Sequence, residues 1–384
     1  MRRFGKAVGY MPPKDRVNRL MYNRALSTLN EHLIIPSASN SHFKKEQLIE
    51  SLLYLSVEER YAESGLEDLA CTREAPSADT LLYRLKKIES QDAYGMLIQA
   101  NDSVIEELKS EGVFGKPVIA AIDYTKDPYF GEYTNMVLRS KRELGTNLFY
   151  TYASLHIVEA GRRITVSTIP VYQLEDHALI VEELVKAARD KGIRIHTLLI
   201  DRGFYTIDAM NILDELKVRY LMPAVKNSRI KHVIEDCHNH LIPNMVKLTM
   251  RRDSGEEASF SLIIHPKKDA EDADPIHERY TVFATNMKYP EAFKLYPEIP
   301  EEYRKRWGIE TGFRVQNTIK AKTTSTNYTI RLIYQMLSIM LYNIWQLANI
   351  ILTIELKREL TKPIIKLTQL TRIFRLKLEL NKPP

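Results

Sequence analysis

Two short apolar runs, each followed at once by an aspartate, constrain the fold of this 384-residue chain more than any other feature. Residues 118–122 precede Asp123, and residues 197–200 precede Asp201. Apolar runs of this length are typical of strands that are buried on both faces of a sheet. Neighbouring strands can present the side chains at their ends along one edge of the sheet, so we expect the two carboxylates to lie close together.

The segments around these runs predict an α/β core. Residues 148–158 and 163–171 are rich in β-branched and aromatic residues and are expected to form a hairpin. Helices are expected over residues 177–191 and 206–216, and a short strand over residues 218–222. The order β, β, β, α, β, α matches an RNase H-like core, a mixed five-stranded sheet with flanking helices whose first three strands form an antiparallel meander.

Changes of pattern along the chain predict four regions. Short strand-like runs joined by charged linkers interrupt the core pattern between residues 224 and 299. The predicted regions are an all-α N-terminal region over 1–112, the core over 113–223 and 300–354, a β-rich insertion over 224–299, and a basic C-terminal tail over 355–384.

The all-α region is expected to contain short helices over residues 46–55, 57–62 and 77–88. Ser77 is expected to cap the last of them, because its hydroxyl can accept a free N–H group of the first turn. This helix carries Arg84 and Lys87 towards its end and could lie in a DNA groove. A packing helix with a solvated basic face is the alternative, and both interpretations stay open.

Positive charge is concentrated at the two ends of the chain. The formal net charge is +6 and the pI is about 9.0, which suits a polyanionic partner. Residues 1–24 carry seven Lys or Arg against one Asp, and residues 355–384 carry eight against three Glu. Both ends are therefore predicted to be basic arms, which either bind nucleic acid or keep the protein soluble.

Other features disfavour several classes of protein. The two cysteines, Cys71 and Cys237, argue against a disulfide scaffold and favour a reducing cytosol, so a cytoplasmic location is expected. His232, His238 and His240 lie near Cys237, but their spacing matches no zinc finger. The sequence has no P-loop and no Gly-x-Gly-x-x-Gly fingerprint, which disfavours nucleotide-binding classes.

Residues 332–354 contain no charged residue and are long enough to span a bilayer. Polar side chains recur there at steps of three or four and form a stripe along one helical face: Gln335, Ser338, Tyr342, Gln346 and Asn349. So many hydroxyl and amide groups would be costly in lipid. We therefore expect a long helix packed against a sheet, and no membrane partner.

A third carboxylate, Glu310, lies in a basic and aromatic segment that is expected to be helical. Helical spacing places Arg306 and Arg314 one turn to either side of Glu310, and Tyr303 two turns before it. Such a face can be a simple ion-pair ladder on the surface. If it also reaches the two aspartates that follow the apolar runs, the three carboxylates could hold Mg²⁺ at a phosphodiester.

These motifs resemble those of DDE insertion-sequence transposases, in the superfamily whose signature is Tyr-x2-Arg-x3-Glu-x6-Lys. Tyr303, Arg306 and Glu310 match the first three positions. The resemblance covers about residues 115–350 and includes three segments around the aspartates, the last of them similar to archaeal members: 121–123, 199–205 and 123–131.

The chain departs from the signature at its last position, where Asn317 stands in place of lysine. Candidate replacements are Arg314, Lys320 and Lys322, of which Arg314 lies nearest the Glu310 face. Together with the basic helix of the all-α region, the resemblance implies DNA contacts for six residues: Tyr303, Arg306, Arg314, Lys320, Arg84 and Lys87.

The resemblance implies a DNA transposase that binds terminal inverted repeats and performs cut-and-paste transposition. Asp123, Asp201 and Glu310 would be its catalytic residues and the ligands of Mg²⁺, with Mn²⁺ as a substitute. The implied partners are double-stranded DNA and a second copy of the chain in a synaptic complex, at the nucleoid of a prokaryotic cell. The insertion would hold flanking or flipped DNA, and any base stacking there would fall to one of its aromatic residues: Phe260, Tyr280, Phe283 or Tyr289.

Two other functions stay open. An RNase H-fold nuclease would cut DNA without strand transfer, and a DNA-binding protein derived from a transposase would do neither. Three carboxylates disfavour the second alternative, because binding DNA does not require them.

Overall fold

The computed structural model describes residues 13–37, 40–172, 177–357 and 362–380. The chain divides into two compact units, which we call the helical unit (1–115, 160–164 and 312–384) and the sheet unit (116–159 and 165–311). Residues 1–12 of the predicted N-terminal arm, and 358–361 and 381–384 of the predicted tail, lie outside the described residues.

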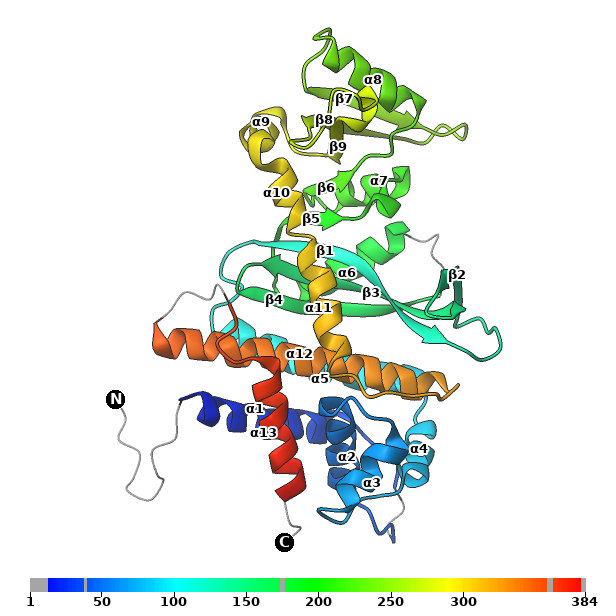
Figure 1. Cartoon of the computed structure of the whole chain (residues 1–384), viewed down its shortest axis with the longest axis vertical. Helices are drawn as coiled ribbons and strands as arrows, with labels where there is room; N and C mark the ends of the chain where they lie inside the picture. Colours follow the sequence, from blue (N-terminus) through cyan, green and yellow to red (C-terminus); the bar gives the residue numbers. More distant parts are fainter. Residues whose placement is uncertain (1–12, 38–39, 173–176, 358–361, 381–384) are drawn as a thin grey trace. The chain divides into compact units, whose positions relative to one another are not determined.

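Five strands form the core that the sequence predicts, in the order β4-β3-β1-β5-β6 (Figure 1). Strand β3 pairs with β1 in the antiparallel sense and β5 pairs with β1 in the parallel sense, as β6 does with β5. This mixed sheet with flanking helices confirms the predicted α/β fold. The bounds are Val118–Tyr129 (β1), Thr146–Glu159 (β3), Arg162–Val171 (β4), Ile195–Ile200 (β5) and Tyr220–Pro223 (β6).

Four further strands extend the same sheet to nine, where the sequence predicted five. Strand β2 (Leu138–Glu143) pairs with β3, and β9 (Tyr280–Thr285) pairs with β6. Strands β8 (Glu257–Pro266) and β7 (Met245–Arg251) follow β9. The predicted insertion over 224–299 is thus β-rich but continues the core sheet, because the free edge of β6 offers backbone groups that need partners.

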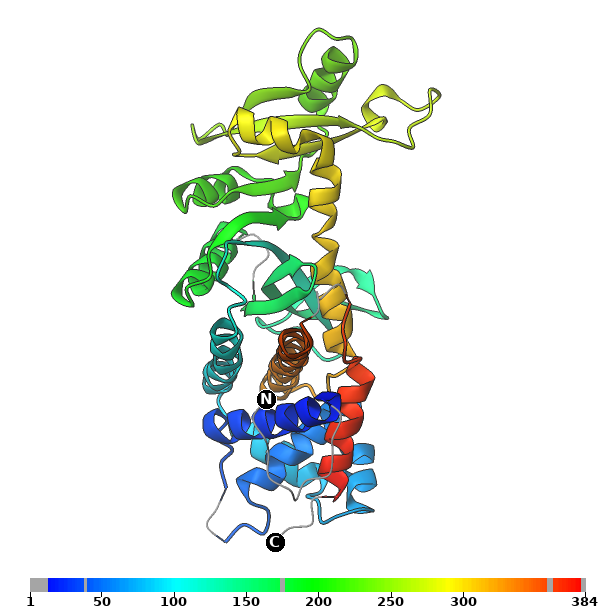
Figure 2. The same ribbon diagram turned by 90° about the vertical axis from the view of Figure 1, so that its left-hand side faces the viewer.

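Helices cover both faces of the sheet unit. In Figure 2, α6 (His177–Asp190) and α7 (Ile207–Glu215) lie on one face and α10 (Ile299–Arg304) lies on the other. Helix α6 buries side chains at steps of three and four, as a helix on a sheet must: Ile180, Val181, Leu184, Val185 and Ala188. The unit also contains α8 (Ser228–His238), α9 (Tyr289–Leu295) and short 3-10 turns at Arg202–Phe204, Ile276–Glu278 and Tyr296–Glu298.

The helical unit contains seven complete helices in its described part: α1 (Pro13–His32), α2 (Lys45–Val57), α3 (Ala62–Ala70), α4 (Ala78–Lys86), α5 (Ser90–Ser110), α12 (Tyr328–Leu356) and α13 (Leu367–Leu380). The predicted helix over 57–62 is wrong. The chain turns there, with Glu59 at a positive φ of 52°, and α3 begins at Ala62. The cap prediction is confirmed, because the Ser77 side chain accepts the Thr80 N–H.

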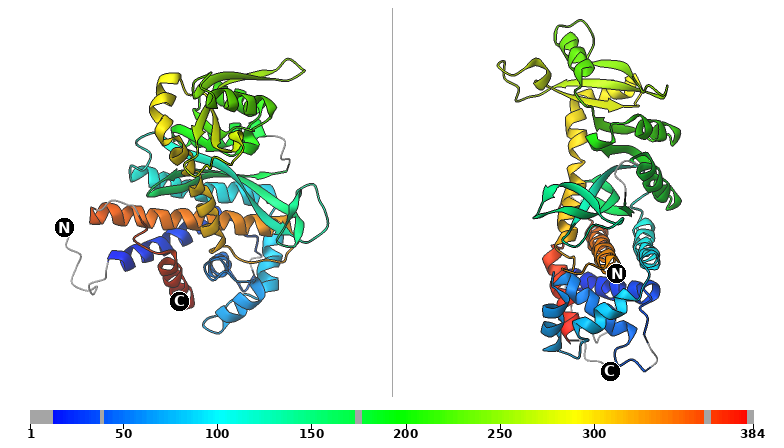
Figure 3. Two further views of the ribbon diagram at one scale, coloured as in Figure 1. Left: turned by 45° about the horizontal axis from the view of Figure 1, so that its top comes forward. Right: turned by 90° about the vertical axis from the view of Figure 1, so that its right-hand side faces the viewer.

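Helix α12 is, by length and composition, capable of crossing a membrane, but 83% of its most apolar stretch is buried inside the structure. It lies beside α5, as the end-on view in Figure 3 shows. The Asn343 side chain of α12 donates a 2.8 Å hydrogen bond to the Asn101 Oδ1 of α5. Asn343 is not part of the predicted polar stripe, but Asn349 of the stripe accepts the Ile365 N–H at 2.8 Å. Amide groups of this helix are therefore used for packing within the helical unit.

Both predicted basic arms are packed helices where the structure describes them. Helix α13 buries Leu370, Phe374 and Leu378, and the Phe374 ring meets Tyr22 of α1 edge-on at 5.4 Å between centroids. Arg16 of α1 forms an ion pair with Glu355. The prediction of a tail over 355–384 is wrong for 367–380, because its apolar residues recur at helical spacing and complete a core.

Because His156 of β3 is buried, we expect the folded protein to lose stability in acid. Burial lowers the pKa of His156 to about 3, while the unfolded chain takes up this proton near pH 6.5. The contribution of neutral His156 is complete above pH 6.5 and is lost as the pH falls towards 3, at about 1.4 kcal/mol per pH unit.

We expect His156→Gln to flatten the decline of the unfolding free energy between pH 6.5 and about 4, measured by urea denaturation. Glutamine does not titrate and can still bond Thr165 Oγ1, which lies 3.2 Å from His156 Nε2. The exposed His232 supplies the control, since His232→Gln should leave the slope unchanged. An equally steep decline in His156→Gln would contradict the assignment.

Candidate active site

Strand register places the first two carboxylates side by side. Ile122 of β1 is paired with Ile200 of β5, so the next residues along the two parallel strands are Asp123 and Asp201. The sequence predicted that this strand ends at Asp123. In the structure, β1 continues to Tyr129 in antiparallel pairing with β3. Asp123 thus stands where the β1–β5 pairing ends, and the continuing strand holds its backbone rigidly.

An aromatic cluster that the sequence did not reveal is formed by residues that follow the two aspartates. Tyr124 follows Asp123, and Phe204 ends the 3-10 turn after Asp201; their rings stack at 5.4 Å with an interplanar angle of 7°. The Tyr124 hydroxyl lies 2.8 Å from Nδ1 of His177, at the start of α6. The only sequence signal was that each aspartate is followed within three residues by an aromatic residue.

The sequence predicted one continuous helix for the segment that carries Glu310, but the structure has two. Helix α10 ends at Arg304 and α11 begins at Trp307 and runs to Asn317. Arg306 lies in the turn between them, where its N–H donates to the Tyr303 carbonyl at 2.9 Å. Glu310 is in the first turn of α11, where a carboxylate is favoured by the helix dipole.

Arg306 joins two of the three carboxylates. Its Nη1 donates a 2.5 Å hydrogen bond to Asp123 Oδ2, and its Nη2 donates a 2.6 Å bond to Glu310 Oε1. The exposed fraction is 11% for the Arg306 side chain, 19% for Asp123 and 48% for Glu310. One partly buried guanidinium group therefore joins Glu310 to an aspartate that lies 183 positions before Arg306 in the sequence.

The electrostatics of the cluster favour a further cation. Burial raises the pKa of Asp123 and the charge of Asp201 adds to this, although Arg306 and the Tyr124 N–H lower it. Burial by itself would lower the pKa of Arg306, but Asp123, Tyr303 and Glu310 raise it, so the guanidinium stays charged. Three carboxylates thus face one guanidinium, which leaves an excess of negative charge.

The donor chemistry of the cluster fits a hard divalent cation, because Mg²⁺ and Mn²⁺ prefer carboxylate oxygens. As they stand in the described part of the chain, no three His, Cys, Asp or Glu side chains are arranged to hold a metal ion. Arg306 occupies one oxygen of Asp123 and one of Glu310. The residues are therefore suitable ligands, and the guanidinium lies among them.

Tyr303 is positioned by contacts on the sheet side. Its ring packs against Phe283 of β9 at 5.3 Å, and its hydroxyl points at the carbonyl of Ile200, 3.4 Å away, just before Asp201. Burial raises the pKa of Tyr303 to about 12. Tyr303 thus links the turn that carries Arg306 to the end of β5.

The other predicted DNA contacts belong to the helical unit. Arg314 and Asn317 are exposed in the last turns of α11, while the Lys320 Nζ donates to Gln335 Oε1 at 3.2 Å. Lys322 is paired with Glu59 at 3.4 Å. Of the candidate replacements for the signature lysine, Arg314 and Lys322 are exposed and Lys320 is half-buried.

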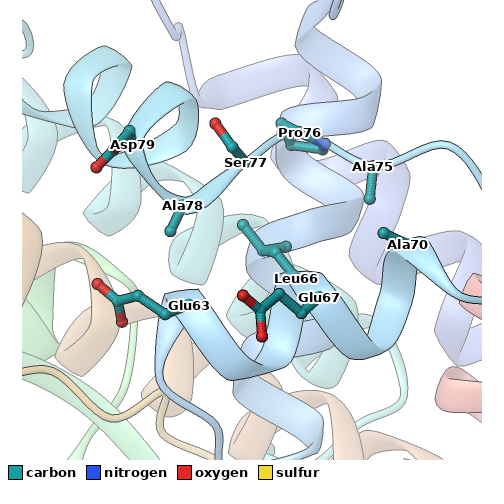
Figure 4. Close-up of a pocket in the computed structure, with 9 residues that line it drawn as sticks. All are labelled: Glu63, Leu66, Glu67, Ala70, Ala75, Pro76, Ser77, Ala78 and Asp79. Carbon is teal, nitrogen blue, oxygen red and sulfur yellow. The ribbon is translucent and has the colours of Figure 1, made fainter.

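Helix α4 is less suited to phosphate than its basic residues suggested. Arg84 donates to Ser41 Oγ at 3.0 Å and so holds a neighbouring loop, and the Lys87 Nζ lies over the Tyr83 ring. A hollow of about 440 Å³ lies beside its N-terminal end (Figure 4), and its polar lining is acidic. Figure 4 shows three carboxylates around it: Glu63, Glu67 and Asp79.

Of the four aromatic residues proposed for base stacking, two belong to the core. Phe260 and Phe283 are 2% and 4% exposed, and the Tyr280 hydroxyl lies 3.0 Å from His238 Nδ1. Tyr289 is 57% exposed and stacks with Phe293. A stacking role therefore remains a proposal for Tyr289 and is wrong for Phe260 and Phe283, because their rings are not accessible.

Residues 175–343 match the family model described as "Transposase DDE domain". This match supports a relation of the chain to DDE transposases, and it includes Asp201 and Glu310 but not Asp123. The comparison with curated proteins found no match. The Tyr-x2-Arg-x3-Glu-x6-Lys superfamily and the archaeal affinity stay predictions.

A solved structure has the same fold: the cryo-EM structure of the piggyBac transposase synaptic complex with hairpin DNA. The two chains are 11% identical, with a TM-score of 0.57, and the likeness covers 97% of this chain and 80% of that one. At this identity the likeness concerns the fold alone. A transposase fold therefore carries the carboxylate cluster described above.

The first turn of α11, which carries Glu310, packs closely on β3. We therefore expect the position of Glu310 to depend on this contact. A Cβ atom added at Gly308 would lie 3.1 Å from the Val158 Cβ and 3.5 Å from its Cα. We expect Gly308→Ala to move the first turn of α11 and lower DNA cleavage about tenfold, since small misplacements of catalytic groups are costly. The measurement is the cleavage rate at saturating DNA.

The matched control is the double variant Gly308→Ala with Val158→Ala. It removes the Val158 Cγ1, which would lie 3.3 Å from the added Cβ, but keeps the Val158 Cβ, so it should recover part of the rate. Full activity of Gly308→Ala alone would contradict the close-packing argument. Loss of activity that Val158→Ala does not relieve would point to a different cause.

Proposed function

We propose that this chain is a DNA transposase that binds the terminal inverted repeats of its element and performs Mg²⁺-dependent cleavage and strand transfer. The observation that carries the proposal is the meeting of Asp123, Glu310 and Arg306, with Asp201 beside them, on a sheet of the transposase type. The match to a transposase DDE domain and the fold shared with a transposase–DNA complex support it.

In the proposed site, Asp123, Asp201 and Glu310 are the catalytic residues and would hold the divalent cations. When bound, these ions supply Lewis-acid stabilisation of the phosphorane charge and lower the pKa of water or of a 3′-hydroxyl. Arg306 and Tyr303 orient the carboxylates and contact a DNA phosphate, and Arg314 contributes positive charge near it.

The proposed chemistry proceeds in two balanced steps. Water attacks the phosphorus at the element end, the bond to the 3′-oxygen breaks, and a 3′-hydroxyl and a 5′-phosphate result. The freed 3′-hydroxyl then attacks a target phosphodiester, whose own 3′-oxygen leaves and takes up the proton. The number of phosphodiester bonds is unchanged in the second step, so the reaction needs no nucleoside triphosphate as an energy source.

Strand transfer tests the proposal directly. A labelled DNA whose 3′-hydroxyl end is already cut at the element boundary is incubated with the protein, Mg²⁺ and a plasmid. Covalent transfer of label to the plasmid is the expected result. Cleavage of uncut ends without transfer would indicate a nuclease, and binding with neither reaction would indicate a DNA-binding protein only.

Two copies of the chain are proposed to act together, because joining two element ends in one event requires two active sites. DNA contacts by Arg84, Lys87 and Lys320, and a location at the nucleoid, are likewise proposals. Crosslinking of the protein on paired element ends would report its stoichiometry.

A further inference from the structure

The guanidinium group of Arg306 occupies carboxylate oxygens that a divalent cation would need. Nη1 lies 2.5 Å from Asp123 Oδ2 and Nη2 lies 2.6 Å from Glu310 Oε1, which are contacts of charged hydrogen bonds. Carboxylates that bind Mg²⁺ or Mn²⁺ offer these same oxygens to the ion. The arginine and the metal therefore draw on one set of donors.

We infer that Arg306 is an internal cation that competes with the divalent metal for Asp123 and Glu310. Metal binding then requires the guanidinium to leave at least one of the two carboxylates. The inference deepens the proposed function and rests on it, because it presumes that these residues are the metal ligands.

The guanidinium is held in a way that allows this displacement. Its Nε is buried and has no hydrogen-bond partner within the described residues, and both Nη bonds named above go to the carboxylates. The backbone of Arg306 lies in the turn between α10 and α11, where its N–H donates to the Tyr303 carbonyl and its carbonyl accepts the Ile309 N–H of α11. The guanidinium carbon lies 5.9 Å from the centre of the Tyr303 ring. Rotation about the side-chain bonds of Arg306 would break the two carboxylate bonds and leave these backbone bonds in place.

Charge strengthens the argument. When the guanidinium moves aside, Asp123, Asp201 and Glu310 lose their nearest positive charge. A divalent ion brings two positive charges in place of the single charge of the guanidinium. The competition should make the unaltered protein bind metal less tightly than the carboxylates alone would.

Mn²⁺ binding to the full chain without DNA tests this inference, with free Mn²⁺ measured by electron paramagnetic resonance. We expect Arg306→Gln to bind Mn²⁺ about tenfold more tightly than the unaltered protein, a coupling of ordinary size for two linked sites. Arg306→Lys should lie between them, because the ammonium group of lysine lacks the planar fork with which the guanidinium bonds both carboxylates. A residue needed merely to hold the site together would change the affinity in the opposite direction.

The matched control is Arg304→Gln, two residues away. Arg304 is exposed and pairs with Glu301 at 2.8 Å, so its removal changes the net charge equally without touching the cluster. Its Mn²⁺ affinity should stay within about twofold of the unaltered protein, since distant surface charges are screened. Circular dichroism of each variant shows whether the fold is retained.

The outcomes separate this inference from the proposed function. If the unaltered protein binds Mn²⁺ and Asp201→Ala weakens it, but folded Arg306→Gln binds no more tightly, the competition is refuted and the proposed metal site stands. If Asp201→Ala has no effect on Mn²⁺ binding, the proposed metal site itself is refuted. If Arg304→Gln gains as much Mn²⁺ affinity as Arg306→Gln, the change in net charge explains the effect and the inference is overturned.

Discussion

Replacing Asp201 with alanine is expected to lower the rate of Mg²⁺-dependent DNA cleavage by about three orders of magnitude or more. Asp201 is exposed directly after β5, so its loss should leave the free energy of unfolding and the binding of element ends nearly unchanged. It is the most informative of the three carboxylates to remove, because Asp123 and Glu310 also hold Arg306. The measurement is cleavage of DNA that carries the element ends.

Asp208 supplies the matched control for this experiment. It is an exposed aspartate in the first turn of α7, and it pairs with Arg252 at 2.6 Å. Cleavage by Asp208→Ala should stay within about twofold of the unaltered protein, because surface ion pairs contribute little. A normal cleavage rate for Asp201→Ala would contradict the assignment of Asp201 as a catalytic residue. The same holds for Asp123→Ala and Glu310→Ala.

Replacing Phe374 with alanine is expected to destabilise the helical unit by about 3–5 kcal/mol, the usual result of emptying a buried phenyl site. Phe374 is fully buried in α13 and meets the Tyr22 ring of α1. The segment was predicted from sequence to be a basic tail, so a large effect would distinguish a core helix from an appendage. Urea denaturation followed by circular dichroism measures the change.

Leu376 lies on the same helix and serves as the control. It is 41% exposed, and Leu376→Ala should change the unfolding free energy by less than about 1 kcal/mol. Equal and small effects for the two variants would mean that α13 contributes no core packing.

Local pattern was enough to predict the strands that carry the aspartates. The runs before Asp123 and Asp201 are short, apolar and uninterrupted, and such runs have few other ways to bury themselves. The first turn of α4 was also predictable, since a serine cap acts over three residues. The strand over residues 280–285 was also predicted, but its pairing with β6 across about 60 residues of sequence was not, because a contact between distant segments decides it.

The same division applies to the site. Spacing alone indicated that Glu310 and Arg306 would be neighbours, because residues four apart meet on a helix, and they do so although the helix begins only at Trp307. No local pattern indicated that the other half of the same guanidinium binds Asp123.

By itself, the sequence determined which residues would form the central strands and that an aspartate would follow each of two apolar runs, since both depend on a pattern within a few residues. Only the tertiary structure decided that Arg306 lies among the carboxylates, that the rings of Tyr124 and Phe204 stack on each other, and that the C-terminal segment completes a core. These contacts join groups that are far apart along the chain, and their energies exist only once the fold has brought the groups together.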